Sequence, residues 1–129
     1  MEPRKKIKIL LIEDDVFMIE LLSHELTQSG FDIAVGTTGT EGIEKYHTEK
    51  PDLILLDLLL PDVLGFEVLR TIRKTPDGAK VKVIVLSNLS ESKDQEEAKR
   101  LGVVEFLVKA NYELPEIIDH VRKALQIST

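Results

Sequence analysis

Cysteine and tryptophan are both missing from this chain of 129 residues, and aromatic residues make up only 5% of it. Without cysteine the chain can form no disulfide, no thiolate metal site and no thiol nucleophile. Long apolar stretches are missing too, and the polar segment of residues 1–6 does not resemble a signal peptide. No apolar run approaches the length of a transmembrane helix. We therefore expect a cytoplasmic protein that makes no contact with a membrane.

Basic residues are the minority charge, since 17 Lys and Arg stand against 23 Asp and Glu, a formal net charge of −6. The short basic run Arg4-Lys5-Lys6 precedes an apolar segment and is typical of a solvated lead-in to a strand. A nucleic-acid surface would need clustered Lys and Arg. The charge balance therefore argues against direct nucleic-acid binding.

Hydrophobic residues make up 43% of the chain, which is enough for a substantial core, and the length suits one domain. Short apolar runs alternate with amphipathic segments that have helical spacing. The runs, which we predict to be strands, are residues 7–12, 31–35, 53–56, 81–86 and 103–108. Such alternation is typical of a parallel sheet with helices on both faces. We predict a single domain over residues 1–129, with a doubly wound, flavodoxin-like α/β fold and strand order 2-1-3-4-5.

Polar residues follow four of the five predicted strands, and they are Glu13-Asp14-Asp15, Asp57, Ser87 and Lys109. In open α/β sheets, ligands bind beyond the carboxyl ends of the strands. In the predicted order these four strands are contiguous, so their polar ends can converge at one edge of the sheet. We assign Asp15 to capping of the first helix and the other residues to a candidate site.

Asp57 follows an apolar run with the composition of a buried strand. A carboxylate that lies close to two others needs a positively charged partner. Each like-charge pair at about 4 Å would cost roughly 4 kcal/mol at an effective dielectric of about 20. Oxygen ligands without nearby His or Cys suit a hard cation, most simply Mg²⁺. Lys109 could pair with a carboxylate or with a phosphoryl oxygen, and Ser87 could donate a hydrogen bond to the same oxygen. Such a site favours phosphoryl transfer, with the carboxylate as the nucleophile that forms an aspartyl-phosphate.

Several motifs, taken together in this order and spacing, resemble the receiver domain of bacterial two-component response regulators over nearly the whole chain. They are residues 9–15, 52–57, 61–65, 83–87 and 106–109. The resemblance implies a signalling switch that catalyses its own phosphorylation and dephosphorylation and is not an enzyme in the usual sense. The phosphoryl donor would be the phosphohistidine of a sensor histidine kinase or of a phosphotransfer protein.

The resemblance also implies roles for the matched acidic residues. Asp57 would be the phosphoacceptor. The Mg²⁺ ligands would be Glu13, Asp14, Asp57 and the backbone carbonyl of Leu59, with Asp14 as a more direct ligand than Glu13.

The remaining matched residues would respond to the phosphoryl group. Lys109 would pair with it, and Ser87 would move toward it. Phe106 would swing inward to follow Ser87, which would alter the face made by the fourth helix, the fifth strand and the fifth helix. A hydroxyl and an ammonium that contact the phosphoryl group in one conformation bias a two-state equilibrium.

Two features depart from the family pattern. Ala110 follows Lys109 where the family usually has proline, often after a cis bond. A cis bond before a residue other than proline costs roughly 2.5–4 kcal/mol, so this loop is either trans and displaced or retains a strained cis bond. Leu59 and Leu89 occupy the positions that flank the phosphoryl group in the family. Because leucine cannot orient an attacking water, we predict a long-lived phosphoryl-Asp57.

Three other functions compete with the phospho-accepting switch. The altered Lys109-Ala110 loop keeps open a degenerate receiver, which would bind proteins independently of phosphorylation. A flavodoxin-like FMN protein would need a Ser, Thr or Gly-rich loop where this chain has Glu13-Asp14-Asp15. A hydrolase with an aspartyl intermediate would normally have its nucleophile after the first strand and an inserted cap domain.

The chain stops soon after the fifth predicted helix, so we expect no output domain. It would be either a stand-alone receiver that acts on a downstream protein or a domain whose output domain is missing. We expect a monomer, or a weak dimer through the fourth and fifth helices.

Overall fold

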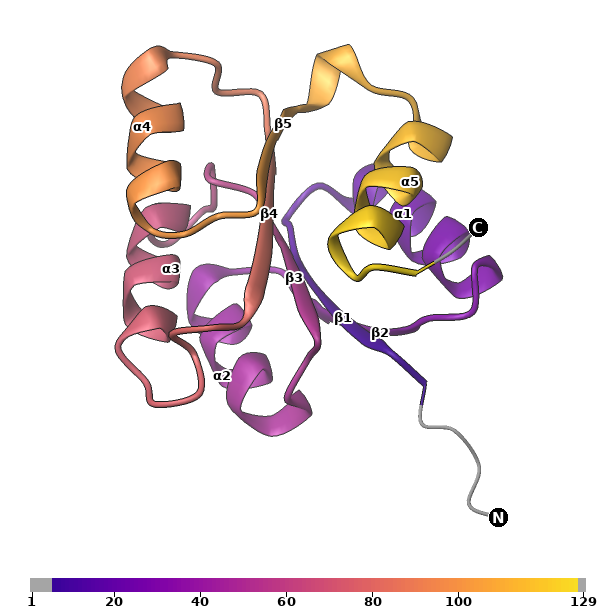
Figure 1. Cartoon of the computed structure of the whole chain (residues 1–129), viewed down its shortest axis with the longest axis horizontal. Helices are drawn as coiled ribbons and strands as arrows, with labels where there is room; N and C mark the ends of the chain where they lie inside the picture. The colour runs from indigo at the N-terminus through magenta and orange to yellow at the C-terminus, as the bar shows by residue number, and fades with distance from the viewer. Residues whose placement is uncertain (1–5, 128–129) are drawn as a thin grey trace.

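The computed structural model describes residues 6–127, in which strands and helices alternate along the chain (Figure 1). The strands are β1 (Lys8–Ile12), β2 (Asp32–Gly36), β3 (Leu53–Leu56), β4 (Lys82–Ser87) and β5 (Glu105–Val108). The helices are α1 (Val16–Gln28), α2 (Gly39–Glu49), α3 (Gly65–Arg73), α4 (Ser92–Arg100), the short 3-10 helix η1 (Lys109–Asn111) and α5 (Leu114–Ala124). Arg4 and Lys5 of the basic run lie outside the described residues.

The strands form a single parallel sheet with the order β2-β1-β3-β4-β5, which confirms the predicted fold. All residues of β3 are buried, and so are all but the first residue of β1 and of β4. These central strands are continuous apolar runs because helices cover both of their faces.

Alternate residues of each central strand face two separate cores. Helices α1 and α5 cover one face of the sheet, and α2, α3 and α4 cover the other (Figure 1). In β1, Ile9 and Leu11 pack into the first core, and Leu10 and Ile12 pack into the second. The buried strands therefore hold their carboxyl ends at fixed positions, and the loops that follow them carry the predicted site residues.

Asp15 caps α1 as predicted, because its Oδ1 accepts hydrogen bonds from the N–H of Phe17 at 2.9 Å and of Met18 at 3.4 Å. Gly65 is the first residue of α3 and lies against the backbone that directly follows β3. A Cβ at Gly65 would lie 2.5 Å from the Asp57 carbonyl oxygen, so only glycine permits this close approach. Between residues 6 and 127, no helix combines the length and the hydropathy that crossing a bilayer requires.

Candidate functional site

The buried polar side chains gather at the carboxyl end of the sheet. Among residues 6–127, the buried polar or charged residues are Glu13, Asp57 and Ser87, and each of them ends or directly follows a central strand. Their places are set by the sheet itself, since the Glu13 N–H donates to the Gly36 carbonyl and the Asp57 N–H donates to the Ile12 carbonyl, both at 3.0 Å. The predicted convergence of Glu13, Asp57 and Ser87 at one edge is therefore found.

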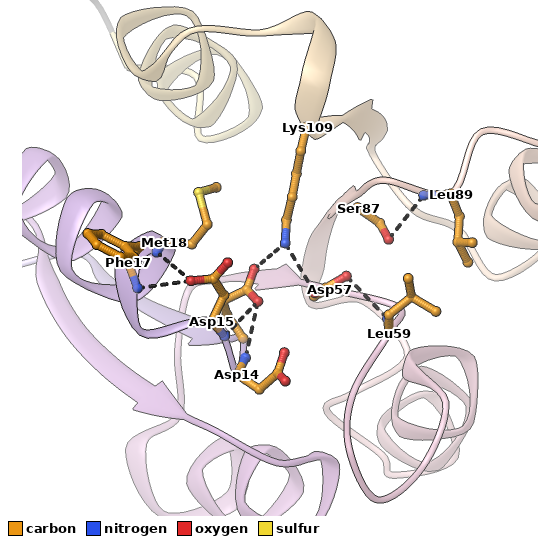
Figure 2. Close-up of polar contacts among 10 residues, drawn as sticks. Asp14, Asp15, Phe17, Met18, Asp57, Leu59, Ser87, Leu89 and Lys109 are labelled. Atoms are coloured by element: carbon orange, nitrogen blue, oxygen red, sulfur yellow. Dashed lines mark hydrogen bonds and ion pairs between the residues drawn. The ribbon is translucent and has the colours of Figure 1, made fainter.

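Lys109 bridges the two buried carboxylates. Its Nζ lies 2.6 Å from Glu13 Oε1 and 3.1 Å from Asp57 Oδ2, and Figure 2 shows its side chain reaching toward Asp57 from the opposite side of the site. Burial alone would lower the pKa of Lys109, but the contact with the Glu13 carboxylate and the charge of Asp57 outweigh burial and raise it. Lys109 is therefore protonated at neutral pH, and its ammonium lies between two carboxylates.

Glu13 is the more buried of the two carboxylates that contact Lys109. Its Oε2 accepts hydrogen bonds from the N–H groups of Asp14 and Asp15, both at 3.1 Å. Burial raises the pKa of Glu13, and this effect exceeds the opposing influence of Lys109 and the backbone donor. A nearby cation would therefore favour the ionised form of Glu13.

A third carboxylate, Asp14, completes an acidic cluster. Asp14 is exposed, and one oxygen from each of Glu13, Asp14 and Asp57 lies within 4.8 Å of the others. Glu13 Oε1 is buried, and the Lys109 ammonium lies 2.6 Å from it. Three carboxylate oxygens so close together are a set of ligands that fits a hard cation such as Mg²⁺.

The backbone after β3 also faces the acidic cluster. The Leu59 N–H donates to Asp57 Oδ1 at 3.2 Å, which fixes the orientation of the Asp57 carboxylate (Figure 2). Figure 2 shows the side chains of Leu59 and Leu89 turned toward one another beside Asp57.

Ser87 lies at the end of β4, and its Oγ accepts a long hydrogen bond of 3.5 Å from the Leu89 N–H. Phe106 is not part of the acidic cluster. It pairs with Val85 in the sheet and packs, partly buried, against the core on the side of α2, α3 and α4. The structure thus brings Glu13, Asp57 and Lys109 into contact, with Ser87 on the next strand and Phe106 further along the sheet.

The loop after β5 resolves the alternative that the sequence left open. Every peptide bond in the described part of the chain is trans, including the bond between Lys109 and Ala110. The chain turns into η1 at this point, and Lys109 nevertheless reaches both carboxylates. The bond is therefore trans, and Lys109 contacts both carboxylates from the turn through its long side chain.

Asp62 is a residue near the site that the sequence did not single out. Its carboxylate accepts hydrogen bonds from Gly39 and Thr40 at the start of α2, which are 23 and 22 residues away in the sequence. An Asp after a proline is a common turn residue. No local pattern identifies its partners.

Known proteins of one family match this chain in sequence and in structure. A sequence model described as the response regulator receiver domain matches residues 9–122. The chain is 33% identical over 102 residues to the alkaline phosphatase synthesis transcriptional regulatory protein PhoP of Bacillus subtilis, which covers 79% of this chain and 42% of PhoP. It is 32% identical over 103 residues to the chemotaxis protein CheY of Thermotoga maritima, which covers 79% of this chain and 84% of CheY.

A solved receiver-domain structure has the same fold as this chain. The non-phosphorylated HemR receiver domain from Leptospira biflexa superposes with a TM-score of 0.87 at 27% identity, covering 96% of this chain and 98% of that domain. The chain spans about half the length or less of the curated transcriptional regulators that it matches, with 42% for PhoP and 51% for a probable regulator, SilR, of Salmonella typhimurium.

Proposed function

Because this chain belongs to the response regulator receiver domain family of two-component systems, we propose that it is a phospho-accepting switch whose acceptor is Asp57. The family consists of signalling modules and not of enzymes in the usual sense. In the proposed reaction, an Asp57 carboxylate oxygen attacks the phosphorus of a phosphohistidine. The P–O bond forms as the P–N bond breaks, and the freed imidazole nitrogen takes up a proton from solvent.

The observation that carries this proposal is the Lys109 ammonium, which lies 3.1 Å from Asp57 and 2.6 Å from Glu13. Phosphorylation adds about −1.5 to −2 charge and three acceptor oxygens at one point. An ammonium already held beside the acceptor can neutralise part of that charge. The alternative of a degenerate receiver depended on the altered Lys109-Ala110 loop. The contacts of Lys109 with Asp57 and Glu13 argue against this alternative.

The acidic cluster supports a Mg²⁺ requirement. The proposed ligands are Glu13, Asp14, Asp57 and the Leu59 carbonyl, with Asp14 as the exposed, direct one. Mg²⁺ would supply positive charge beside the transferring phosphoryl oxygens. The chain's own residues orient Asp57, through the Leu59 N–H, and hold Lys109 within reach of the same oxygens.

The response to phosphorylation would begin at Ser87. The hydrogen bond from the Leu89 N–H to Ser87 Oγ is long, at 3.5 Å. In this bond Ser87 is the acceptor, so its hydroxyl can still donate a hydrogen bond to a phosphoryl oxygen. Movement of Ser87 would shift the loop between β4 and α4. Phe106, which packs only partly buried beside Val85, would then rearrange and change the face of α4, β5 and α5.

The phosphohistidine donor would dock on exposed apolar side chains in the segments that follow β1 and β3, which also carry the acidic residues. Phe17 at the start of α1 is 77% exposed, and Leu64 in the loop before α3 is 60% exposed. Phe17→Ala should slow transfer from a phosphorylated kinase or phosphotransfer domain, while transfer from acetyl phosphate should stay unchanged because a small donor needs no protein contact. Equal slowing with both donors would contradict this assignment.

The decisive experiment measures the intact mass of the protein after incubation with acetyl phosphate and Mg²⁺. We expect one phosphoryl adduct, which is absent with EDTA and absent in Asp57→Asn. The control is Asp52→Asn, because Asp52 is an exposed carboxylate at the opposite end of the sheet. An adduct on Asp57→Asn would refute the acceptor. No adduct on the wild type, with no NMR shifts on adding beryllofluoride, would favour the degenerate receiver.

A further inference from the structure

The loop between β3 and α3 is held to the core at its start and then leaves it. Leu58 is buried, and its carbonyl accepts a hydrogen bond from the Gly65 N–H at 2.9 Å, which closes the base of the loop. Leu59 and residues 61–64 are exposed. The tip of the loop therefore needs another attachment if the Leu59 carbonyl is to keep one position.

Asp62 supplies this attachment. One of its carboxylate oxygens accepts the Gly39 N–H at 2.7 Å, and the other accepts the Thr40 N–H at 3.0 Å and the Thr40 hydroxyl at 2.8 Å. These N–H groups are the first two of α2 and have no partner within the helix. The hydrogen bonds from Thr40 and Gly39 lower the pKa of Asp62, so the carboxylate is ionised at the positive end of the helix dipole.

Close packing accompanies these hydrogen bonds. A Cβ at Gly39 would lie 2.3 Å from Val63 Cγ2 and 3.2 Å from Asp62 Oδ1, so any larger residue would push the loop away from α2. The loop tip is thus fixed to α2 by the Asp62 carboxylate and by the contact between Val63 and Gly39.

This anchor lies close to the metal site along the chain. Asp62 is three residues beyond Leu59, and Pro61, whose ring fixes its φ angle, lies between them. At the other side, the Leu59 N–H is bonded to Asp57. The chain is therefore held at Leu59 by Asp57 and, three residues further on, by the bonds of Asp62 to α2.

We propose that Asp62 is a positioning residue for Mg²⁺, which holds the loop on α2 so that the Leu59 carbonyl stays beside Asp57. The inference rests on the proposed function, in which that carbonyl is a metal ligand. Asp62 itself does not contact the ion. It acts through the loop, as partners outside the ligand shell do when they orient a ligand.

The test is a Mg²⁺ titration of the full chain, followed by ¹H–¹⁵N NMR shifts, for the wild type, Asp62→Ala and Asp62→Asn. We expect the dissociation constant to rise about 10-fold for the alanine variant and about 3-fold for the asparagine variant, at the lower end for loss of an outer partner. Asparagine keeps one acceptor oxygen and should restore part of the affinity. The matched control is Asp52→Asn, because Asp52 Oδ2 also accepts a backbone N–H, from Lys8 at 2.8 Å, but at the far end of the sheet.

Phosphorylation by acetyl phosphate gives a second readout. For Asp62→Ala, the Mg²⁺ concentration for half-maximal rate should rise by the same factor, while the rate at saturating Mg²⁺ stays within about twofold of wild type. An unchanged Mg²⁺ affinity in Asp62→Ala, or an equal loss in Asp52→Asn, would overturn the inference. If the wild type takes up no phosphoryl group at all, the proposed function fails, and the NMR titration still decides the role of Asp62.

Discussion

The two ends of the sheet carry similar ion pairs in opposite surroundings. Where the strands begin, Lys8 Nζ lies 2.7 Å from Glu49, and both side chains are about one-third exposed, at 31% and 32%. Where the strands end, Lys109 Nζ lies 2.6 Å from Glu13, and the two side chains are 14% and 1% exposed. The two N–O distances are similar, but only the Lys109–Glu13 pair is largely shielded from solvent.

Taking charges out of water is costly, and a buried ion pair is often no more stabilising than apolar residues of the same volume. Stability alone therefore does not explain why Glu13, Asp57 and Lys109 share one buried site. The exposed pair closes a surface between β1 and α2 and requires no further explanation. The two ends therefore differ in the burial of their charges and not in the presence of ion pairs as such.

Arg73 is a partly buried cation at the end of the sheet where the strands begin, but its partners differ from those of Lys109. Its guanidinium donates to the carbonyls of Gly78, Val81, Leu101 and Gly102 at 2.6–3.2 Å. Burial lowers the pKa of Arg73. Four of its N–H groups are engaged with backbone acceptors, so Arg73 joins the loops that carry these carbonyls.

The largest effect is expected from Lys109→Met, which leaves the Glu13 and Asp57 carboxylates without their cation. Removal of one partner from a buried pair should lower the free energy of unfolding by about 3 kcal/mol in the absence of Mg²⁺. Mg²⁺ should restore part of the loss because it supplies positive charge to the same oxygens. Urea unfolding followed by circular dichroism, with and without Mg²⁺, measures both. A loss no larger than that of Lys8→Met would erase the proposed difference between the two ends.

The same variant gives a pH dependence. The folded-state pKa of Lys109 is raised above its ordinary value of 10.5, so its stabilising contribution is complete below that pH and is lost as the pH rises through the folded-state value. The difference in unfolding free energy between wild type and Lys109→Met should therefore shrink as the pH rises above 10.5. A difference that already shrinks between pH about 7 and 9 would contradict the raised pKa.

The next effect is expected from Arg73→Met, which leaves four backbone carbonyls without their donor. We expect a loss of about 2 kcal/mol in unfolding free energy. Arg73→Lys should recover little, since one ammonium cannot reach all of these carbonyls. Phosphorylation of the folded variant by acetyl phosphate should be unaffected, and a slowed reaction would show that the two ends are coupled.

A smaller effect is expected on the lifetime of phosphoryl-Asp57. Leu59→Asn introduces an amide that can orient an attacking water, so dephosphorylation should speed up about 10-fold, or about 1.4 kcal/mol of barrier. The exposed Leu59 side chain makes this change tolerable to the fold. Loss of the adduct mass with time measures the rate, and Leu64→Asn in the same loop is the control. An unchanged rate in Leu59→Asn would refute the role of the two leucines.

The smallest effect is expected from Lys8→Met at the beginning of β1. An exposed pair of this kind is worth less than about 1 kcal/mol and weakens as salt is added. Urea unfolding at low and high ionic strength should therefore show a slight loss that disappears with salt. A loss as large as that of Lys109→Met would mean that exposure does not distinguish the two pairs.

The strand order and the site at the carboxyl ends could be predicted because they follow from repeating local patterns. Continuous apolar runs such as Leu53–Leu56 indicate buried parallel strands, and the alternation with helices selects the doubly wound fold. Once that order is known, residues that follow the strands must lie together, so Glu13, Asp57, Ser87 and Lys109 could be named in advance.

Local patterns along the chain are thus enough to place the strands in the sheet and to bring these polar residues to one end of it. Two contacts could not be read from such patterns: Lys109 reaches both carboxylates from a trans turn before Ala110, and Asp62 accepts hydrogen bonds from the start of α2. The physical reason is that strand and helix patterns arise from neighbours along the chain. A bond between Asp62 and Gly39, in contrast, depends on how two separate loops are carried into contact by the packing of α2 and α3 on the sheet.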